Sequence, residues 1–441
     1  MKTAGEAAAM LGVSKRRVYA LIGAGALPAE KAGGIWLVDD AGLERRLASG
    51  VDRRGGRPRK GSGADEVRLA LMNRNHLVAE AVYDVRSGTF SSVGPLTDAD
   101  RAPIGLVDGR GRITAGVLSA WWSGRGIPRA RKGLASVLAR EGVKLPEQLV
   151  YRNLGLSLSD QYWVRPEGLD VTWDELNFFT NDFEKLDVGS EGPGSGRHPD
   201  NTSDGVLPKH WLVAPDGTRM LAKGGGAFLQ EPCNEVIATE LCRRLMPPSQ
   251  FCSYTLESGP GSLTSLCANF LSDEEEYVPA HYVRMVKPQE SHHNDYQHYL
   301  ECCHELGVDD AAQAVSYGIV CDDVMANADR HWRNFGIVRN VETLACRVAP
   351  IFDTGSSLWH DREDLLAARD FTFCSKQFES NPGKQLQLAD LDWVDASKIQ
   401  DLDEYARDVL LKSSLPVQRI DLICEGIRRR VGRLTHICEF L

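Results

Sequence analysis

The stretch NADRHWRNFG, residues 327–336, decides how the whole chain is interpreted. It places Asp329 five positions before Asn334, and the apolar pattern from Phe335 onward predicts that a strand follows the loop. Such a loop presents one carboxylate that can accept a proton and one amide oxygen that can bind a hard cation. We therefore take the loop as the first candidate for a catalytic centre.

A second oxygen ligand follows this loop in the sequence. A strand over 335–339, a turn near Glu342 and a returning strand over 347–352 predict a hairpin that ends at Asp353. The hairpin would bring Asp353 back beside Asn334, so that two oxygen ligands face one metal ion. Two protein ligands suffice for Mg²⁺, which keeps water and phosphate oxygens. The order Asp-x₄-Asn and then Asp is the spacing found in kinases.

The segment DTGS, residues 353–356, also has an alternative interpretation, because it matches the signature of aspartic proteases. That chemistry needs two carboxylates that share one proton. The sequence contains no second Asp-Thr-Gly or Asp-Ser-Gly to supply the other carboxylate. A protease would also leave Asp329 and Asn334 without a role, so this alternative is disfavoured.

The segments that precede the loop 327–336 in the sequence predict a binding site for the phosphates of a nucleotide. The segment 205–213 is typical of a tight loop that enters a strand, and the next strand, 219–223, ends in Lys223. A helix over 230–245 follows and carries Glu235 near its start. A strand lysine followed by a helix glutamate is the ion pair that positions ATP phosphates in kinases. A rigid binding module with coincidental residues is the alternative.

Residues 203–380 resemble the HipA-like serine/threonine kinases, which are distantly related in fold to phosphoinositide kinases. The segments that carry the resemblance are GVLPK at 205–209, AK at 222–223, NE at 234–235, NADRHWRNF at 327–335 and PIFD at 350–353. The resemblance implies an α+β chain with a bilobal protein-kinase-like fold. It also implies an ATP- and Mg²⁺-dependent kinase that phosphorylates a protein substrate on serine or threonine, as a toxin or a regulator.

The resemblance assigns roles to individual residues. Asp329 and Lys223 would be the catalytic residues, Asp329 as the base and Lys223 as the group that binds the ATP phosphates, and Asn334 and Asp353 would hold Mg²⁺. The residues expected to bind or support the nucleotide are Gly205, Lys209, Lys223, Glu235, Asn269, Phe270 and His331. Asn269 and Phe270 belong to the segment 266–271, our candidate for the hinge that meets adenine. His331 either supports the catalytic loop or is a hydrogen-bonded buried histidine.

A hydroxyl near the glycine-rich loop can be autophosphorylated in this family, which shuts the enzyme off. Thr202 and Ser203 occupy that place in the chain. We therefore hypothesise that one of them is such a switch.

The first sixty residues are basic, whereas the rest of the chain is acidic. Residues 1–60 carry a formal charge of +6, and the chain as a whole carries −10. A capping box at Thr3–Glu6 predicts a helix from Ala4 to about Gly12, Ser14 can cap a second helix to Ile22, and a hairpin turning at 33–34 leads to a helix over 40–49. The exposed start of the second helix carries the candidate DNA contacts Lys15, Arg16, Arg17 and Tyr19.

This arrangement resembles the winged helix-turn-helix domains of the excisionase/MerR type and implies DNA as a partner. A small helical protein-docking module is the alternative. The basic linker that follows, 51–64, contains Gly56-Arg57-Pro58, which resembles the core of an AT-hook or is a plain solvated linker. HipA-like toxins usually work beside a separate helix-turn-helix antitoxin, and the resemblance therefore implies an antitoxin as a candidate partner. In this chain, however, the predicted DNA-binding domain is part of the same polypeptide as the kinase-like segment.

The remaining segments suggest how the domains are divided. We expect a winged helix-turn-helix domain at 1–50, the linker at 51–64, an accessory subdomain at 65–188, a kinase N-lobe at 189–285 and a kinase C-lobe at 286–441. Within the accessory subdomain we expect strands over 67–72 and 76–83 and helices over 115–123, 129–141 and 173–183. No motif there carries chemistry, so we interpret it as a packing domain, followed by a loop over 189–204.

The cysteine content and the distribution of apolar residues bear on the cellular compartment of the protein. The 11 cysteines all lie from Cys233 onward without a C-x-x-C pair, which indicates reduced thiols and not a disulfide scaffold. There is no run of about 18 apolar residues and no signal-peptide pattern at the N-terminus, so we expect a cytoplasmic protein without a membrane partner. The alternative to an active kinase is a DNA-binding transcriptional regulator whose pseudo-kinase body only senses a nucleotide.

Overall fold

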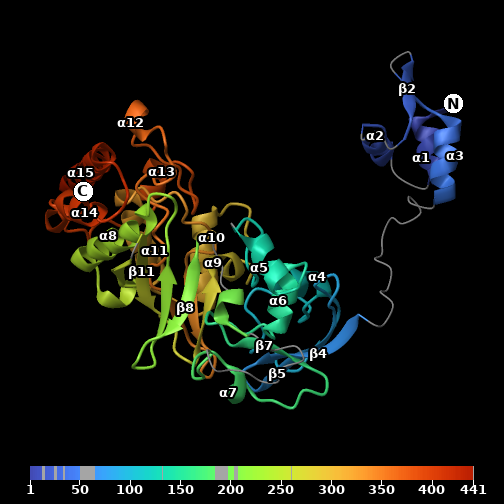
Figure 1. Cartoon of the computed structure of the whole chain (residues 1–441), viewed down its shortest axis with the longest axis horizontal. Helices are drawn as coiled ribbons and strands as arrows, with labels where there is room; N and C mark the ends of the chain where they lie inside the picture. The colour runs from blue at the N-terminus through green and yellow to red at the C-terminus, as the bar shows by residue number, and fades with distance from the viewer. Residues whose placement is uncertain are drawn as a thin grey trace. The chain divides into compact units, whose positions relative to one another are not determined.

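The structure is a computed structural model. It describes residues 1–11, 15–23, 27–32, 35–49, 65–131, 133–183, 197–202, 207–259 and 261–440. The chain divides into two compact units, Met1–Asp65 and Glu66–Leu441 (Figure 1). The finer division of the larger unit at residues 188 and 285 stays a prediction.

The smaller unit consists of three helices and a three-stranded antiparallel sheet in the order β1-β3-β2. Its elements are β1 (Lys2–Thr3), α1 (Ala4–Leu11), α2 (Lys15–Gly23), β2 (Ala29–Ala32), β3 (Ile35–Val38) and α3 (Asp40–Ser49). The predicted capping box is confirmed, because the Glu6 N–H donates to Thr3 Oγ1 at 3.3 Å and the Thr3 N–H donates to Glu6 Oε2 at 2.8 Å. The three predicted helices and the antiparallel pairing of the hairpin strands are also confirmed, whereas the short strand β1 was not predicted. Gly12, Ser14, the turn at 33–34 and the predicted linker at 51–64 lie outside the described residues.

The larger unit begins with a four-stranded antiparallel sheet in the order β6-β5-β4-β7. Its strands and the helices that follow them in the chain are β4 (Glu66–Asn73), β5 (His76–Asp84), β6 (Thr89–Leu96), α4 (Ala115–Ser123), α5 (Leu134–Arg140), α6 (Pro146–Arg152), β7 (Tyr162–Pro166) and α7 (Trp173–Leu176). Tyr83 of β5 and Trp122 of α4 meet edge to face in the core of this part, where both are fully buried. The two predicted strands and the helix over 115–123 are confirmed.

Two predicted helices in this part differ from the structure. The helix expected over 173–183 ends at Leu176, because Asn177 adopts an extended conformation and its side-chain oxygen accepts from the Thr180 N–H at 2.8 Å. The aromatic residues after it lie in an irregular segment, where they are buried in a hydrophobic cluster shared with Met72 of β4 and Trp163 of β7. The helix expected from residue 129 begins only at Leu134, directly after Gly133, whose φ of 81° lies in the left-handed region.

The larger unit contains two further sheets, and a strand of the second directly follows the loop 327–335. The first has the order β10-β11-β9-β8, and the second has the order β12-β13-β14. Their strands are β8 (Lys209–Val213), β9 (Arg219–Lys223), β10 (Tyr254–Gly259), β11 (Ser262–Ala268), β12 (Glu275–Pro279), β13 (Gly336–Asn340) and β14 (Cys346–Val348). Helix α8 (Gln230–Leu245) packs against β10 and β11.

The predicted hairpin before Asp353 is present but shorter than expected. The returning strand ends at Val348, because Ile351 leaves it and forms a parallel bridge with Phe251. The Ile351 carbonyl accepts from the Cys252 N–H at 2.8 Å. This bridge ties the chain just before Asp353 to the segment that precedes β10.

The rest of the larger unit is mainly helical. Its elements are α9 (Ala280–Val283), α10 (Asp295–Glu305), α11 (Ala311–Val324), α12 (Leu365–Ala368), α13 (Pro382–Leu386), α14 (Leu402–Leu410) and α15 (Val417–Glu439), with the 3₁₀-helices η1 (Pro199–Thr202), η2 (Pro248–Gln250) and η3 (Ala396–Ile399). Within this unit α8, α14 and α15 gather at one end and β4, β5 and β7 with α4–α6 at the other, with β8 and β11 between them (Figure 1).

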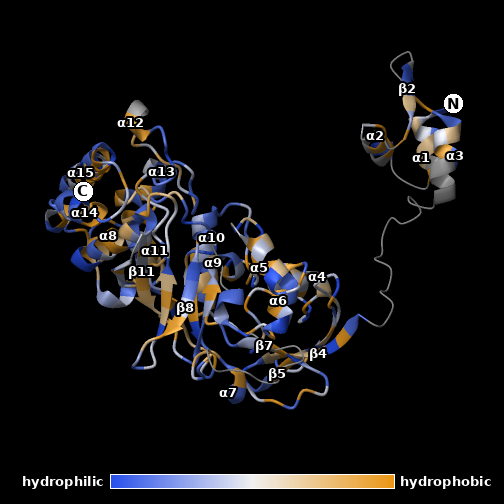
Figure 2. Cartoon of the chain, in the orientation of Figure 1, coloured by the Kyte–Doolittle hydropathy of each residue, from blue (hydrophilic) through white to orange (hydrophobic). Residues whose placement is uncertain are grey.

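The helices of the larger unit have mixed surfaces. Polar residues interrupt the apolar ones along them (Figure 2), and within the described ranges no helix combines the length and the apolar character that crossing a membrane requires. All eleven cysteines are free thiols, and eight of them are buried. Cys302 and Cys303 lie in the core on α10, as expected for a helical core segment.

Candidate active site

Lys223, the last residue of β9, is the centre of a buried cluster of charges. Its Nζ lies 2.6 Å from Oε1 of Glu235 on α8 and 2.6 Å from Oδ1 of Asp353. It also donates a hydrogen bond of 3.2 Å to the hydroxyl of Tyr254, and only 6% of Lys223 is exposed. The structure thus brings together three residues that the sequence named and that lie up to 130 positions apart.

The opposite charges in this cluster stabilise one another. Burial alone would lower the pKa of Lys223, but the carboxylates of Asp353 and Glu235 outweigh burial and raise it well above its usual value. Burial would raise the pKa of Asp353, but the ammonium groups of Lys223 and then Lys209 hold it well below its usual range. Lys209 lies directly opposite Lys223 in the register of β8 and β9. Lys223 and Asp353 therefore carry opposite charges at neutral pH.

Thr354 fixes the orientation of Glu235, which the sequence alone did not reveal. Oε2 of Glu235 accepts from the Thr354 N–H at 2.9 Å and from its hydroxyl at 2.8 Å. These two bonds leave Oε1 to face Lys223. Asp353 itself has a φ of 57°, a left-handed conformation that aspartate tolerates better than most side chains. Asp353 and Thr354 thus contact Lys223 and Glu235, and they do not form the carboxylate pair of an aspartic protease.

Hydrogen bonds within the loop 327–334 fix its conformation. The Asp329 N–H donates to Oδ1 of Asn327 at 3.0 Å, and the His331 N–H donates to the Asp329 carbonyl at 2.8 Å. Nδ2 of Asn334 donates to the same carbonyl at 3.0 Å. This bond fixes the orientation of the Asn334 amide group and leaves its oxygen, Oδ1, as the atom that can bind a cation.

Arg330 joins the catalytic loop to the segment before Asp353. Its guanidinium contacts Asp322 of α11 at 2.9 and 3.1 Å, and one nitrogen, Nη1, donates to the carbonyls of both Asn334 and Phe352. Burial would lower the pKa of Arg330, but the Asp322 carboxylate outweighs it and raises the pKa. One buried side chain thereby holds the two predicted magnesium ligands on neighbouring stretches of chain.

We expect Arg330→Met to destabilise the larger unit by about 3–5 kcal/mol, because it leaves the Asp322 carboxylate buried without its partner. Urea unfolding followed by circular dichroism measures the change. The matched control is Arg347→Met, which removes an arginine from a surface pair with Glu275 and should cost about 0–1 kcal/mol. Equal effects of the two substitutions would contradict the bridging role of Arg330.

Asp329 has an unforeseen neighbour. Its Oδ1 lies 2.6 Å from Nζ of Lys376, which belongs to the segment between α12 and α13. Both side chains are partly open to solvent, so the ion pair adds little stability. His331 is half-buried, and its Nδ1 accepts from the Arg333 N–H at 3.2 Å, which agrees with a supporting position in the loop.

Several of these residues line a cavity of about 510 Å³. The predicted residues that line it are Lys209, Lys223, Asn269, Phe270, Asp329, His331, Asn334 and Asp353. Glu235 lies behind Lys223, and Gly205 and Ser203 lie outside the described residues. The segment 266–271 borders the cavity, but the Asn269 N–H already donates to the Arg219 carbonyl at 2.7 Å and its side-chain amide to the Leu158 carbonyl at 3.0 Å. The adenine contact of this segment stays a prediction.

The part of the chain interpreted as a packing domain also lines this cavity. Its contribution comes from residues far apart in the sequence, which include Trp121, Arg125, Ser157 and Asp160. Sequence reasoning missed them because no local motif marks them. Thr202 borders the cavity too, but it is only 7% exposed and its hydroxyl donates to the Leu156 carbonyl at 2.7 Å.

The cavity and its charges fit a magnesium nucleotide. Its volume lies within the range of about 300–1,000 Å³ that is usual for small-molecule sites. A carboxylate oxygen of Asp353 and the amide oxygen of Asn334 are hard ligands of the kind Mg²⁺ takes, and two ammonium groups face the same space. The donor set is therefore adequate for a metal that is also bound by phosphate.

In the smaller unit, Lys15, Arg16 and Tyr19 are exposed along the first half of α2. The side chain of Arg17, the remaining predicted DNA contact, is outside the described residues. The three described side chains are therefore available to a ligand, as the prediction requires.

Comparison with known proteins supports both units. Residues 3–50 match the helix-turn-helix domain family. Among solved structures, the chain is similar to HipA from the HipA, HipB and operator DNA complex of the Shewanella oneidensis MR-1 toxin–antitoxin system, with a TM-score of 0.51 and 13% identity over 84% of this chain and 99% of that chain.

It is also similar to the proinflammatory kinase CtkA of Helicobacter pylori, with a TM-score of 0.39 and 15% identity over 52% of this chain and 94% of that chain. No curated protein matches the sequence. The chain therefore combines an N-terminal helix-turn-helix domain with a HipA-like fold, as the sequence predicted.

Proposed function

We propose that the protein is an ATP- and Mg²⁺-dependent protein kinase of HipA type that phosphorylates serine or threonine and binds DNA through its N-terminal unit. The observation that carries the proposal is the position of Lys223, 2.6 Å from both Glu235 and Asp353, in a cavity that Asp329 and Asn334 also line. Phosphoryl transfer depends mainly on positioning and on charge stabilisation, and these are the groups that supply both.

When bound, magnesium and ATP supply the transferable phosphoryl group and a cation that neutralises part of its charge. Lys223 then offsets phosphate charge, while Glu235 keeps its ammonium in place. Oδ1 of Asn334 and the carboxylate of Asp353 would hold the metal. Since Lys376 contacts Oδ1 of Asp329, we assign Oδ2 to the substrate hydroxyl, which it orients and deprotonates.

The alternative is a DNA-binding regulator whose kinase-like body senses a nucleotide without using it. The ion pair between Asp329 and Lys376 favours it, because it engages part of the carboxylate that catalysis needs. Measuring transfer of the γ-phosphate from labelled ATP beside equilibrium binding of ATP, both with Mg²⁺, separates the two. We expect both binding and transfer. Binding without transfer to substrate or to the chain itself would support the alternative.

DNA binding is proposed from the helix-turn-helix domain, in which the second helix usually enters the major groove. HipA of S. oneidensis occurs in a complex with HipB and operator DNA. Because this chain carries its own helix-turn-helix domain, we propose that it reaches DNA directly and acts as a toxin or as a regulator, with or without an antitoxin partner.

Lys15→Ala combined with Arg16→Ala is expected to weaken binding to duplex DNA and to make its salt dependence less steep. Each lost phosphate contact lowers the slope of log K against log salt by about one, so the slope should fall by about two. Fluorescence anisotropy over a range of salt concentrations measures this. The control, Arg110→Ala with Lys144→Ala, removes two exposed charges from the larger unit and should leave the slope unchanged. A slope that changes in the control double variant but not in the Lys15→Ala, Arg16→Ala variant would refute the assignment.

A further inference from the structure

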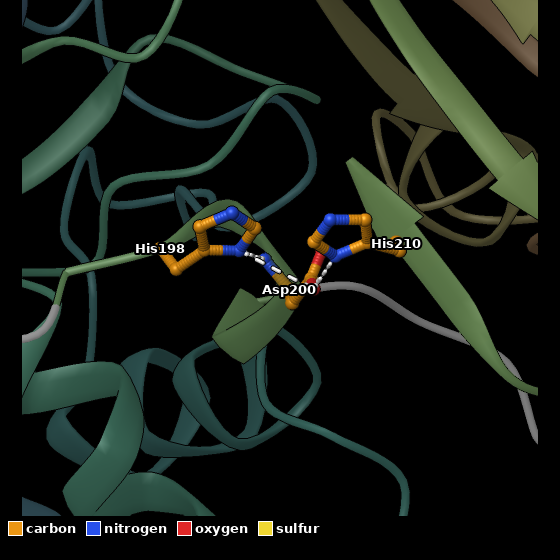
Figure 3. Close-up of side chains that lie close together, drawn as sticks. All are labelled: His198, Asp200 and His210. Carbon is orange, nitrogen blue, oxygen red and sulfur yellow. Dashed lines mark hydrogen bonds and ion pairs between the residues drawn. The ribbon is translucent and has the colours of Figure 1, made fainter. Parts of the chain in front are cut away.

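Two histidines and an aspartate form a cluster that the proposed kinase chemistry does not use (Figure 3). His198 precedes η1, Asp200 lies within it, and His210 lies on β8. Nδ1 of His198 is 3.3 Å and Nδ1 of His210 is 2.6 Å from the same carboxylate oxygen, Oδ2 of Asp200. Three potential ligand atoms therefore lie within 4.8 Å of one another.

The donor set selects a class of metal. Two imidazole nitrogens and one carboxylate oxygen suit Zn²⁺, whereas Mg²⁺ and Ca²⁺ prefer oxygen ligands alone. Ligands at about 2.0–2.1 Å in a tetrahedron lie about 3.3 Å from one another. The distance from His198 to Asp200 already has this value. The 2.6 Å contact of His210 is a hydrogen bond, whose proton a metal ion would displace.

Two hydrogen bonds define the state of the ligand atoms. The Asp200 N–H donates to Nδ1 of His198 at 3.2 Å, so this nitrogen is unprotonated, and a metal ion would take its lone pair in place of that hydrogen bond. The Trp211 N–H donates to Oδ1 of Asp200 at 2.8 Å, so the other oxygen, Oδ2, faces the histidines. The edge of Phe183 packs against His198 with the ring centroids 5.0 Å apart.

The cluster is accessible and lies beside the cavity. The side chains of His198, Asp200 and His210 are 24%, 28% and 55% exposed, so an ion can enter from solvent and water can fill a fourth position. The neighbouring residues Thr202 and Lys209 line the cavity of the candidate active site.

We propose that His198, Asp200 and His210 bind one Zn²⁺ ion, which joins η1 to β8. The site is separate from the proposed magnesium ligands and does not depend on the proposed kinase activity. An ion here would couple the two segments that flank residues 203–206, the stretch that contains Gly205. It would thereby connect the edge of the cavity to the start of the strand that carries Lys209.

The test is a zinc titration of the full-length chain after removal of bound metal. A chromophoric chelator competes for Zn²⁺, and excess Mg²⁺ occupies the oxygen sites. We expect one tight equivalent in the unsubstituted chain. His210→Ala should weaken it by more than the about tenfold to hundredfold that loss of an outer contact costs, and Asp200→Asn should weaken it as well. Co²⁺ in place of Zn²⁺ should give the visible absorption of a tetrahedral site, which His210→Ala abolishes.

The matched control is His292→Ala. His292 belongs to the second group of potential metal ligands among the described residues, with Glu290 and His293. Loss of zinc binding in the control instead of in His210→Ala would overturn the proposal, as would undiminished binding in both His198→Ala and His210→Ala. The variants and the chain with which they are compared all carry Cys374→Ser, because that exposed thiol could bind zinc by itself.

A second measurement tests the link between the two segments. Hydrogen exchange read by mass spectrometry should slow over 198–202 and 209–213 when Zn²⁺ is added to the unsubstituted chain. The His210→Ala variant should show no such change, while its circular dichroism spectrum confirms that it is folded. Exchange that is unaffected by zinc in the unsubstituted chain would refute the connection.

Discussion

Asp353→Asn is expected to abolish phosphotransfer, with a loss of at least about a thousandfold in kcat/KM, while the chain remains folded. The substitution removes the charge that faces Lys223 and one of the two proposed magnesium ligands. Lys223 keeps Glu235 at 2.6 Å, so no buried ammonium group is left unpaired. Asparagine also tolerates the left-handed backbone conformation of residue 353, whereas alanine pays a steric penalty there.

The measurement is a steady-state assay with labelled ATP over a range of Mg²⁺ concentrations. Asp309→Asn, on an exposed aspartate that does not line the cavity, is the matched control and should retain activity. Asp353→Ala should show the same loss of activity as Asp353→Asn, with a somewhat lower melting temperature. Turnover that is unchanged in both substitutions at Asp353 would remove this residue from the metal site.

Asp329→Ala is expected to lower kcat by about a hundredfold to ten-thousandfold and to leave the affinity for magnesium ATP almost unchanged. The carboxylate is assigned to the substrate hydroxyl, and the loop around it is held by backbone bonds and by Asn327, which the substitution leaves in place. Removing the exposed ion pair with Lys376 should change stability little.

Nucleotide binding by calorimetry and single-turnover transfer together test this assignment. Asp309→Ala is the control for a lost exposed carboxylate. The two catalytic variants should differ in a diagnostic way: Asp353→Asn changes the dependence on Mg²⁺, and Asp329→Ala does not. If Asp329→Ala instead lost ATP binding with normal transfer at saturation, its role as a base would be wrong.

The sequence predicted those parts of the site that rest on short-range patterns. The Asp-x₄-Asn spacing, the strand that ends in Lys223 and the helix that carries Glu235 are each contained in a few residues, and their elements form as expected. The capping box at Thr3 is of the same kind, because its two hydrogen bonds span only three positions. The long aromatic segment after Leu176 was interpreted wrongly, because Asn177 and tertiary burial outweighed its helical pattern.

The sequence by itself determined which residue types are present, in which order, and on which helix, strand or turn most of them lie. Only the tertiary structure decided that Lys376 reaches Asp329, that Arg330 holds two carbonyls at once, and that His198 and His210 share one carboxylate. The physical reason is range: caps, turns and periodic patterns act over a few residues, whereas these contacts join segments whose approach depends on how sheets and helices pack.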